Sequence, residues 1–230
     1  MMTSLERSKQ VARLLIQIPS IGLASLFYSS AIQLSSLRAD LLDIADPWWV
    51  VTIGLVLLLS PIYHLIVIGQ VAAFHRKESA SLDSLPLETF GDLVLGELLV
   101  NALVVLGSTF LFLPGIYVGL RSIYYKQIII LQKARPVEAI RDSFRLTRPP
   151  GVLFRMFLLL AVSYSLPLVV EYLLAPMMQA WWIHLIGILV STSFLAWINT
   201  YITLLFVDGM PSVEAGGSEE QSPSTHDPLA

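Results

Sequence analysis

The sequence lacks cysteine and has few charged residues. None of its 230 residues is cysteine, and only 13% are Asp, Glu, Lys or Arg, against about a quarter in typical soluble proteins. The absence of cysteine excludes disulfides, thiolate nucleophiles, iron–sulfur clusters and cysteine zinc sites. The hydrophobic content of 55% and the mean hydropathy of +0.72 exclude a soluble domain, because a compact chain of this size must cover a large surface with polar side chains. We therefore expect an integral membrane protein with an all-α fold.

The signatures of soluble enzymes and of nucleic-acid-binding proteins are also absent from the sequence. The net charge of −3 gives no basic excess for nucleic acid. The four histidines are scattered, and no zinc-protease, nucleophile-elbow or phosphate-loop motif occurs. The sequence therefore predicts no catalytic residue, no cofactor-binding residue and no metal ligand, and we expect a non-enzymatic protein without a cofactor.

Long apolar runs divide the chain into membrane spans. Four of them reach the ~20 residues that cross a bilayer. A fifth run, residues 93–131, would extend roughly 58 Å as one helix, about twice the thickness of a hydrocarbon core. The dipeptide Pro114-Gly115 suits a type II turn, so this run is expected to form a hairpin. The six predicted spans are residues 11–37, 48–74, 93–113, 115–132, 152–174 and 181–207.

The distribution of Lys and Arg favours this layout. Positive residues prefer the cytoplasmic side in short loops, and the six-span arrangement places eleven of the fourteen there. If Pro114 is only a kink, and the chain from Arg121 onward lies at the interface, five spans result and the strongest basic run lies outside. We expect one transmembrane domain, residues 1–209, in the plasma or inner membrane of the cell, with both termini cytoplasmic. Residues 210–230, rich in Gly, Ser, Pro and Glu, are expected to be a disordered tail.

An amphipathic helix is predicted over residues 134–148, between the fourth and fifth spans. Val137, Ile140 and Phe144 recur at helical spacing, and basic residues lie beside this stripe. Such a helix can rest on the acyl boundary while its guanidinium groups meet lipid phosphates. The alternative is that these residues only satisfy the positive-inside preference. The candidate headgroup contacts are Arg141, Arg145 and Arg148, and the predicted partners are membrane lipids, with anionic lipids as the hypothesis that these arginines raise.

This part of the chain resembles a known family. The segments are residues 113–117 (LPGIY), Arg121, residues 128–131 (IIIL) and residues 136–147 (PVEAIRDSFRLT). They are similar to the YciC-like membrane proteins and to the related membrane domain of glycerophosphoryl diester phosphodiesterases, which carry a PG motif, an arginine, an apolar run and A-x-x-x-S-x-x-L-T. The resemblance covers about 35 residues and implies a polytopic bacterial-type membrane protein. The phosphodiesterase activity is not carried over, because its barrel needs on the order of 250 residues.

Ionisable and amide side chains inside the predicted spans are candidates for function, because such groups are costly in lipid. Glu97 and Lys126 lie at matching depths in the third and fourth spans, and we expect them to pair. The predicted intramembrane cluster is His64, Glu97, Asn101, Arg121 and Lys126.

The sequence leaves more than one function open. The favoured interpretation is a non-enzymatic membrane protein that contacts lipids or organises membrane partners, and the protein partners are unknown. The alternative is a small transporter or channel subunit, in which the cluster lines a polar cavity that opens inward. A membrane-embedded enzyme ranks third.

Overall fold

A computed structural model describes residues 4–39, 47–76, 87–110, 112–174 and 181–209, and leaves aside some side chains within these ranges. Within these ranges the chain forms helices and no strands, which confirms the all-α prediction. The predicted disordered tail, residues 210–230, lies outside the described residues. The helices are α1 (Ser4–Gln17), α2 (Pro19–Ala39), α3 (Pro47–His75), the short 3-10 helix η2 (Leu87–Thr89), α4 (Phe90–Phe110), α5 (Phe112–Arg121), α6 (Tyr125–Gln132), α7 (Pro136–Leu146), α8 (Pro150–Leu174) and α9 (Trp181–Gly209).

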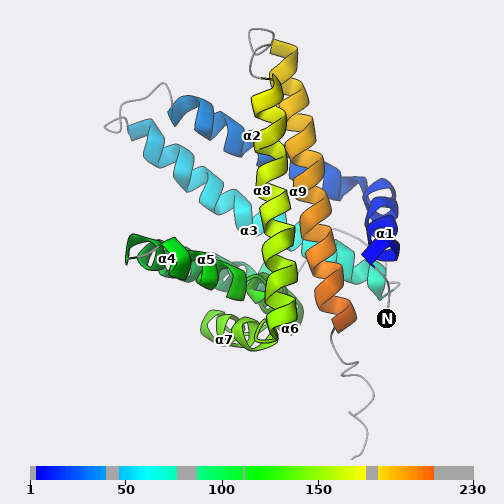
Figure 1. The fold of residues 1–230 in the computed structure, drawn as a ribbon, viewed down its shortest axis with the longest axis vertical. Coiled ribbons are helices and arrows are strands. Elements are labelled where there is room, and N and C mark those ends of the chain that lie inside the picture. The colour runs from blue at the N-terminus through cyan, green and yellow to red at the C-terminus, as the bar shows by residue number, and fades with distance from the viewer. Residues whose placement is uncertain (1–3, 40–46, 77–86, 111, 175–180, 210–230) are drawn as a thin grey trace, which may run out of the picture.

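Consecutive helices pair into hairpins that point in different directions (Figure 1). The α8–α9 hairpin stands upright, the α2–α3 hairpin crosses it at an angle, and the α4–α5 hairpin extends to the side above α7. Two apolar clusters hold these parts together. One surrounds α6, where Ile128 and Ile129 are fully buried, and the other joins α1, α3 and α9 around Val11, Val67 and Leu204.

Several of these helices could cross a membrane. Among the described residues, three segments are long and apolar enough: Leu58–His75 in α3, Leu87–Thr109 in η2 and α4, and Ile186–Gly209 in α9. A fourth results if α1 and α2 count as one bent span. Membrane-crossing helices are therefore supported, whereas the six-span layout is not confirmed.

The first predicted span, residues 11–37, is not one straight helix. Its residues are divided between α1 and α2, which meet at an angle of 88°. Proline explains the bend: Pro19 has no N–H to donate, and its ring disfavours a helical conformation of the preceding residue. The amide of Ile18 still bonds to the Leu14 carbonyl at 2.8 Å, so helical hydrogen bonding continues to the residue before the proline, one residue after the end of α1.

The predicted turn at Pro114-Gly115 is also displaced. The apolar run does fold back on itself, but the change of direction lies between α4 and α5, and both residues belong to the first turns of α5. A type II turn would require a positive φ at Gly115, and no glycine that the structure describes has one. The prediction of a type II turn is therefore wrong. Gly115 serves close packing instead, because a Cβ there would lie 2.9 Å from the Val104 carbonyl oxygen of α4.

The fourth predicted span, residues 115–132, is broken in the structure. Helix α5 ends at Arg121 and α6 begins at Tyr125. Neither proline nor glycine occurs between them, so the local sequence does not explain the break. Its cause lies in α7, as the contacts below show.

Candidate functional site

Four polar side chains from three helices meet inside the protein, and we call Ser60, His64, Glu97 and Lys126 the buried cluster. One carboxylate oxygen of Glu97, Oε1, lies 2.7 Å from the Lys126 Nζ atom and accepts a hydrogen bond from the Ser60 hydroxyl at 2.7 Å. Ser60 and His64 lie one turn apart on α3, Glu97 lies on α4 and Lys126 on α6. The cluster therefore ties α3, α4 and α6 together through a single carboxylate.

The ring of His64 completes this arrangement. Its Nδ1 atom lies 2.7 Å from the Ser60 carbonyl oxygen, which can only accept, so we assign the ring proton to Nδ1. The Nε2 atom is then an acceptor, and it lies 3.2 Å from the Lys126 ammonium. The His64 ring and the Glu97 carboxylate thus contact the same Lys126 ammonium group.

Aromatic rings and further polar groups surround the cluster. The Tyr63 ring packs edge-on against His64 with centroids 4.9 Å apart, and Tyr28 stacks on Tyr63 at 4.8 Å. The Tyr63 hydroxyl accepts a hydrogen bond from the Asn199 amide of α9 at 3.2 Å and one from the Ser25 hydroxyl of α2 at 3.4 Å. Through Tyr63 the polar core reaches α2 and α9, which explains how helices from different hairpins are held in register.

The structure brings together three of the five residues predicted for this site. His64, Glu97 and Lys126 meet, and the expected pairing of Glu97 with Lys126 is observed. Asn101 does not belong to the cluster: it lies one turn after Glu97 on α4 and is exposed. The sequence analysis missed Ser60 as a member, although its hydroxyl one turn before His64 was a usable signal.

Arg121 also lies apart from the cluster, at the end of α5. Its Nη1 atom donates to the Phe144 carbonyl oxygen of α7 at 3.0 Å, and its Nε and Nη2 atoms donate to the Tyr117 hydroxyl at 3.0 and 2.8 Å. Its guanidinium also lies 5.0 Å from the centroid of the Tyr117 ring. Arg121 therefore fastens α5 to α7 and does not line a cavity with Glu97.

The break between α5 and α6 is built by two hydroxyls of α7. Ser143 donates to the Arg121 carbonyl oxygen at 2.8 Å and accepts from the Tyr124 amide at 3.1 Å. The Thr147 hydroxyl lies 2.7 Å from the Ser143 carbonyl oxygen, one turn earlier, and 3.1 Å from the same Arg121 oxygen. Backbone groups released by a helix break must find partners inside the protein when water is absent, and Ser and Thr side chains commonly supply them. These hydroxyls therefore explain a break that no proline or glycine causes.

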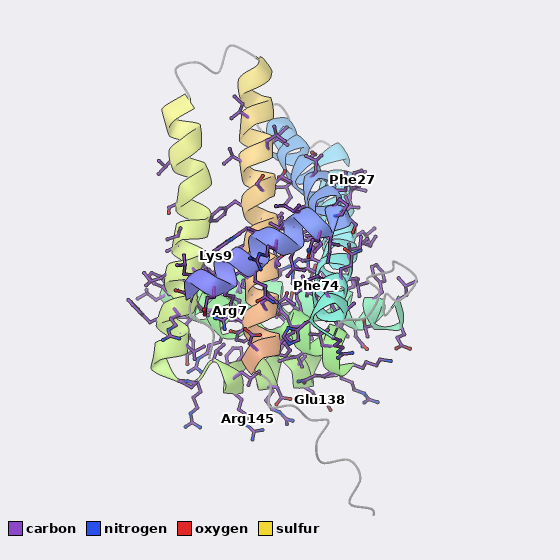
Figure 2. All side chains as sticks on the ribbon, turned by 90° about the vertical axis from the view of Figure 1, so that its right-hand side faces the viewer. Arg7, Lys9, Phe27, Phe74, Glu138 and Arg145 are labelled. Atoms are coloured by element: carbon purple, nitrogen blue, oxygen red, sulfur yellow. The ribbon has the colours of Figure 1, made fainter. Side chains whose placement is uncertain are left out.

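The four sides of α7, together with Thr147 and Arg148 directly after its end, differ in chemistry. Ala139, Ser143 and Thr147 are fully buried against the rest of the protein. The next stripe round the helix is Val137, Ile140 and Phe144, and of these Val137 is 69% exposed. The following stripe is the basic face, which we define as Arg141, Arg145 and Arg148, and the last holds Glu138 and Asp142. All three arginines of the basic face are exposed, and Figure 2 shows Arg145 and Glu138 pointing away from the helices.

The helix predicted over residues 134–148 is therefore present as Pro136–Leu146. Its apolar stripe is half-exposed next to the arginines, as the interfacial interpretation requires. A second, small and polar stripe, which the sequence analysis did not single out, carries the contacts with the protein.

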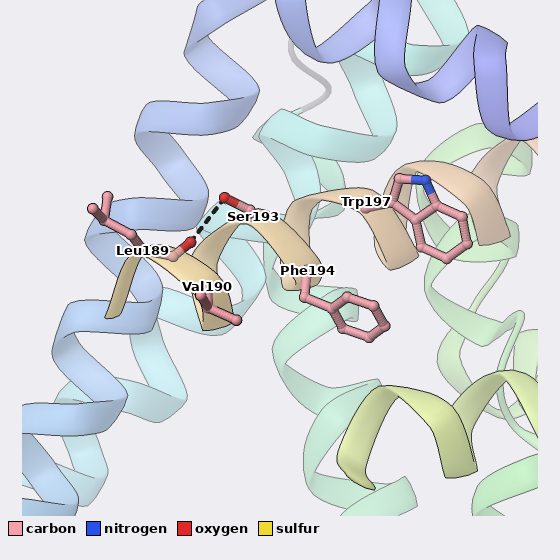
Figure 3. Close-up of a pocket in the computed structure, with 5 residues that line it drawn as sticks. All are labelled: Leu189, Val190, Ser193, Phe194 and Trp197. Atoms are coloured by element: carbon pink, nitrogen blue, oxygen red, sulfur yellow. Dashed lines mark hydrogen bonds between the residues drawn. The ribbon is translucent and has the colours of Figure 1, made fainter. Parts of the chain in front are cut away.

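Other possible sites are limited in the part of the chain that the structure describes. No group of three or more His, Asp or Glu side chains is placed to hold a metal ion. A shallow groove runs along α9 and is lined by Leu189, Val190, Ser193, Phe194 and Trp197 (Figure 3). Its one hydroxyl, that of Ser193, donates to the Leu189 carbonyl oxygen at 2.8 Å. The groove is therefore apolar and offers no group for chemistry.

Comparisons of the chain with protein families, with characterised proteins and with solved structures give no match.

Proposed function

We propose that the protein is a non-enzymatic integral membrane protein whose helix α7 contacts anionic lipid headgroups. The observation that carries the proposal is the division of α7 into opposite faces. Ser143 and Thr147 anchor one face to the break between α5 and α6, while the arginines of the basic face remain exposed. A helix fixed in this way presents its charges in a constant position.

The charge of the surrounding segment supports a lipid ligand. Residues 133–155 hold six Lys or Arg and two Asp or Glu, so the segment carries +4 in a chain with a net charge of −3. Each Lys or Arg near an anionic membrane surface contributes roughly 1 kcal/mol of attraction at physiological ionic strength. The half-exposed Val137 stripe beside the arginines can enter the acyl boundary while the guanidinium groups stay at the phosphates.

The transporter alternative has less support. Transport along the buried cluster would need polar atoms that are free to bind a solute, yet the Glu97 Oε1 atom is engaged by both Lys126 and Ser60. The cluster also lacks Asn101 and Arg121, two of the groups that the alternative requires. This arrangement favours a structural role for the buried charges.

Topology and family are part of the same proposal. We propose six spans in the plasma or inner membrane with both termini cytoplasmic, on the charge distribution given above.

We also propose kinship with the YciC-like membrane proteins. In its support, Ala139 and Ser143 of α7 and its C-cap residue Thr147, which belong to the shared A-x-x-x-S-x-x-L-T motif, are all fully buried. The motif would then have a structural role, because its Ser143 and Thr147 hydroxyls contact the backbone at the break between α5 and α6.

The proposal is tested by measuring which lipids the protein retains. The protein is purified in mild detergent and analysed by native mass spectrometry after mixing with phosphatidylglycerol or phosphatidylcholine. The triple variant Arg141→Gln, Arg145→Gln, Arg148→Gln should lose retained phosphatidylglycerol, with apparent affinity falling on the order of 100-fold at low salt for about 3 kcal/mol. Retention of phosphatidylcholine should not change.

Two controls separate charge from packing. Replacing the same three residues by Lys keeps the charge and should preserve most of the retained lipid. Replacing Glu138 by Gln and Asp142 by Asn alters the same helix without touching the basic face, and should not weaken binding. Equal phosphatidylglycerol retention by wild type and the triple Gln variant would refute the proposal, and a solute lost on replacement of Lys126 would favour the transporter instead.

A further inference from the structure

Helix α1 presents two different faces. Arg7, Val11 and Leu14 recur at helical spacing and are buried against the protein. On the opposite face Leu5 is 65% exposed and Ile16 is 81% exposed, although both are large aliphatic residues. An exposed apolar face of this kind on a helix already packed on its other side indicates a second contact surface.

The position of α1 is fixed by an ion pair to the end of α9. The Nε and Nη2 atoms of Arg7 lie 3.0 and 2.9 Å from the Asp208 Oδ2 atom. The Arg7 guanidinium also lies 6.0 Å from the centroid of the Tyr201 ring. Figure 2 shows α1 crossing α9, with Arg7 and Lys9 on it. The ion pair holds α1 against α9, so its outer face has a constant direction.

The direction of α1 separates it from the spans. It meets α2 at 88° and runs across α9, whose residues Ile186–Gly209 are long and apolar enough to cross a membrane. Helix α2 has 21 residues and extends about 31 Å, the thickness of a hydrocarbon core, although its described residues count as a candidate span only together with α1. If α2 crosses the membrane, a helix at 88° to α2 runs along the membrane plane and not along its normal.

Cationic side chains accompany the exposed apolar residues of α1. Lys9 and Arg13 are exposed and fall between Leu5 and Ile16 on the outer face. Long cationic side chains keep their charged ends at the phosphates while their stems cover apolar surface. The combination of aliphatic and cationic residues on one face is typical of helices that lie in a membrane interface.

We infer that α1 is a surface-lying helix whose outer face, Leu5, Lys9, Arg13 and Ile16, rests on the headgroup layer of an anionic membrane. The residues predicted as the start of the first span then lie along the membrane surface, and the chain enters the membrane at Pro19. The ligand is the phospholipid interface itself. This inference stands on residues of α1 and does not depend on the basic face of α7.

The absence of cysteine makes the inference directly measurable. Single cysteines at Leu5 and Ile16 are spin-labelled in the full-length protein in nanodiscs of phosphatidylcholine and phosphatidylglycerol, and the depth of each label is read from its accessibility to oxygen and to a nickel chelate. The matched control is Val51 and Ile62 of α3, which are also exposed and also eleven residues apart. The two α1 labels should have the same shallow depth, whereas the two control labels should differ by about 16 Å if α3 runs along the membrane normal.

Three outcomes would overturn the inference. A depth difference of about 16 Å between the α1 labels would make α1 the beginning of a span. If both labels are as accessible to the nickel chelate as a label in bulk water, α1 does not contact the lipid. Dipolar broadening between labels of two protein molecules would assign the face to a second copy of the chain.

A charge reversal tests the anionic part of the inference. Lys9→Glu with Arg13→Glu should raise the nickel accessibility of the Ile16 label several-fold in anionic nanodiscs. The reversal Arg141→Glu on α7 should leave the same label unchanged, which keeps this inference separate from the proposed function. An Ile16 label that does not respond to reversal at Lys9 and Arg13 would overturn the role of the headgroup charge.

Discussion

The buried cluster and the basic face of α7 use charge in opposite ways. In the cluster, Lys126 and Glu97 lie 2.7 Å apart between three helices, and their side chains are 20% and 6% exposed. On α7, Arg141, Arg145 and Arg148 are exposed and the helix is held by hydroxyls on its other side. The difference teaches that the first set of charges is taken up by contacts within the protein, whereas the second set is exposed at the surface.

The largest expected effect is the loss of one partner in the cluster. Lys126→Met should lower the free energy of unfolding by about 3–5 kcal/mol, because it leaves a buried carboxylate without a cation. Glu97→Gln should cost less, since the remaining Lys126 side chain is partly exposed. The double variant should recover most of the loss, because no lone charge stays buried. Unfolding in detergent, followed by circular dichroism, measures all three.

A double variant no more stable than the worse single variant would show that the two charges do not act as a pair. Transport or channel activity that disappears in Glu97→Gln, without loss of stability, would move the cluster from architecture to function.

An intermediate effect is expected at the hydroxyls that anchor α7. Ser143→Ala and Thr147→Val should each lower the free energy of unfolding by about 1–3 kcal/mol, because buried backbone groups of the break lose their partners. Thr109→Val is the matched control: its hydroxyl donates to the Val105 carbonyl oxygen in the same way, but the residue is exposed. Thermal unfolding of the three variants compares them, and equal shifts for Thr147 and Thr109 would contradict the anchoring role.

The smallest effect on stability is expected at the basic face. Each Arg→Gln substitution at Arg141, Arg145 or Arg148 should change the free energy of unfolding by no more than about 0.5 kcal/mol, because exposed positions contribute little to the fold. The same variants should retain less anionic lipid. Lipid binding should therefore fall while the free energy of unfolding stays nearly unchanged. A triple variant that unfolds several degrees earlier in lipid-free detergent would show that these arginines also support the fold.

Part of this arrangement could be predicted from the sequence. The helical class follows from composition, the pairing of Glu97 with Lys126 follows from their matching positions on neighbouring apolar runs, and α7 follows from its periodicity. Ser60 could have been added, because a hydroxyl four residues before His64 lies on the same side of a helix.

The helix breaks were harder to predict, and for different reasons. The bend between α1 and α2 has a local cause in Pro19. It was not predicted, because the apolar run of residues 11–37 is long enough to be taken for one continuous span. Pro61 lies inside α3 without ending it, so proline alone does not mark a break. The break between α5 and α6 has no local cause at all, because its backbone groups bond to Ser143 and Thr147, about twenty residues later in the chain. Such a contact is visible only when the helices have been placed in space.

The hydrogen bonds from Ser143 and Thr147 also order the events of biosynthesis. The carbonyl of Arg121 and the amide of Tyr124 leave the ribosome before the hydroxyls that satisfy them, and these groups are expensive to leave unpaired in lipid. If the break lies within the bilayer, as the proposed six-span layout implies, the segment from α5 to α7 is expected to reach its final position as one unit, after α7 has been made.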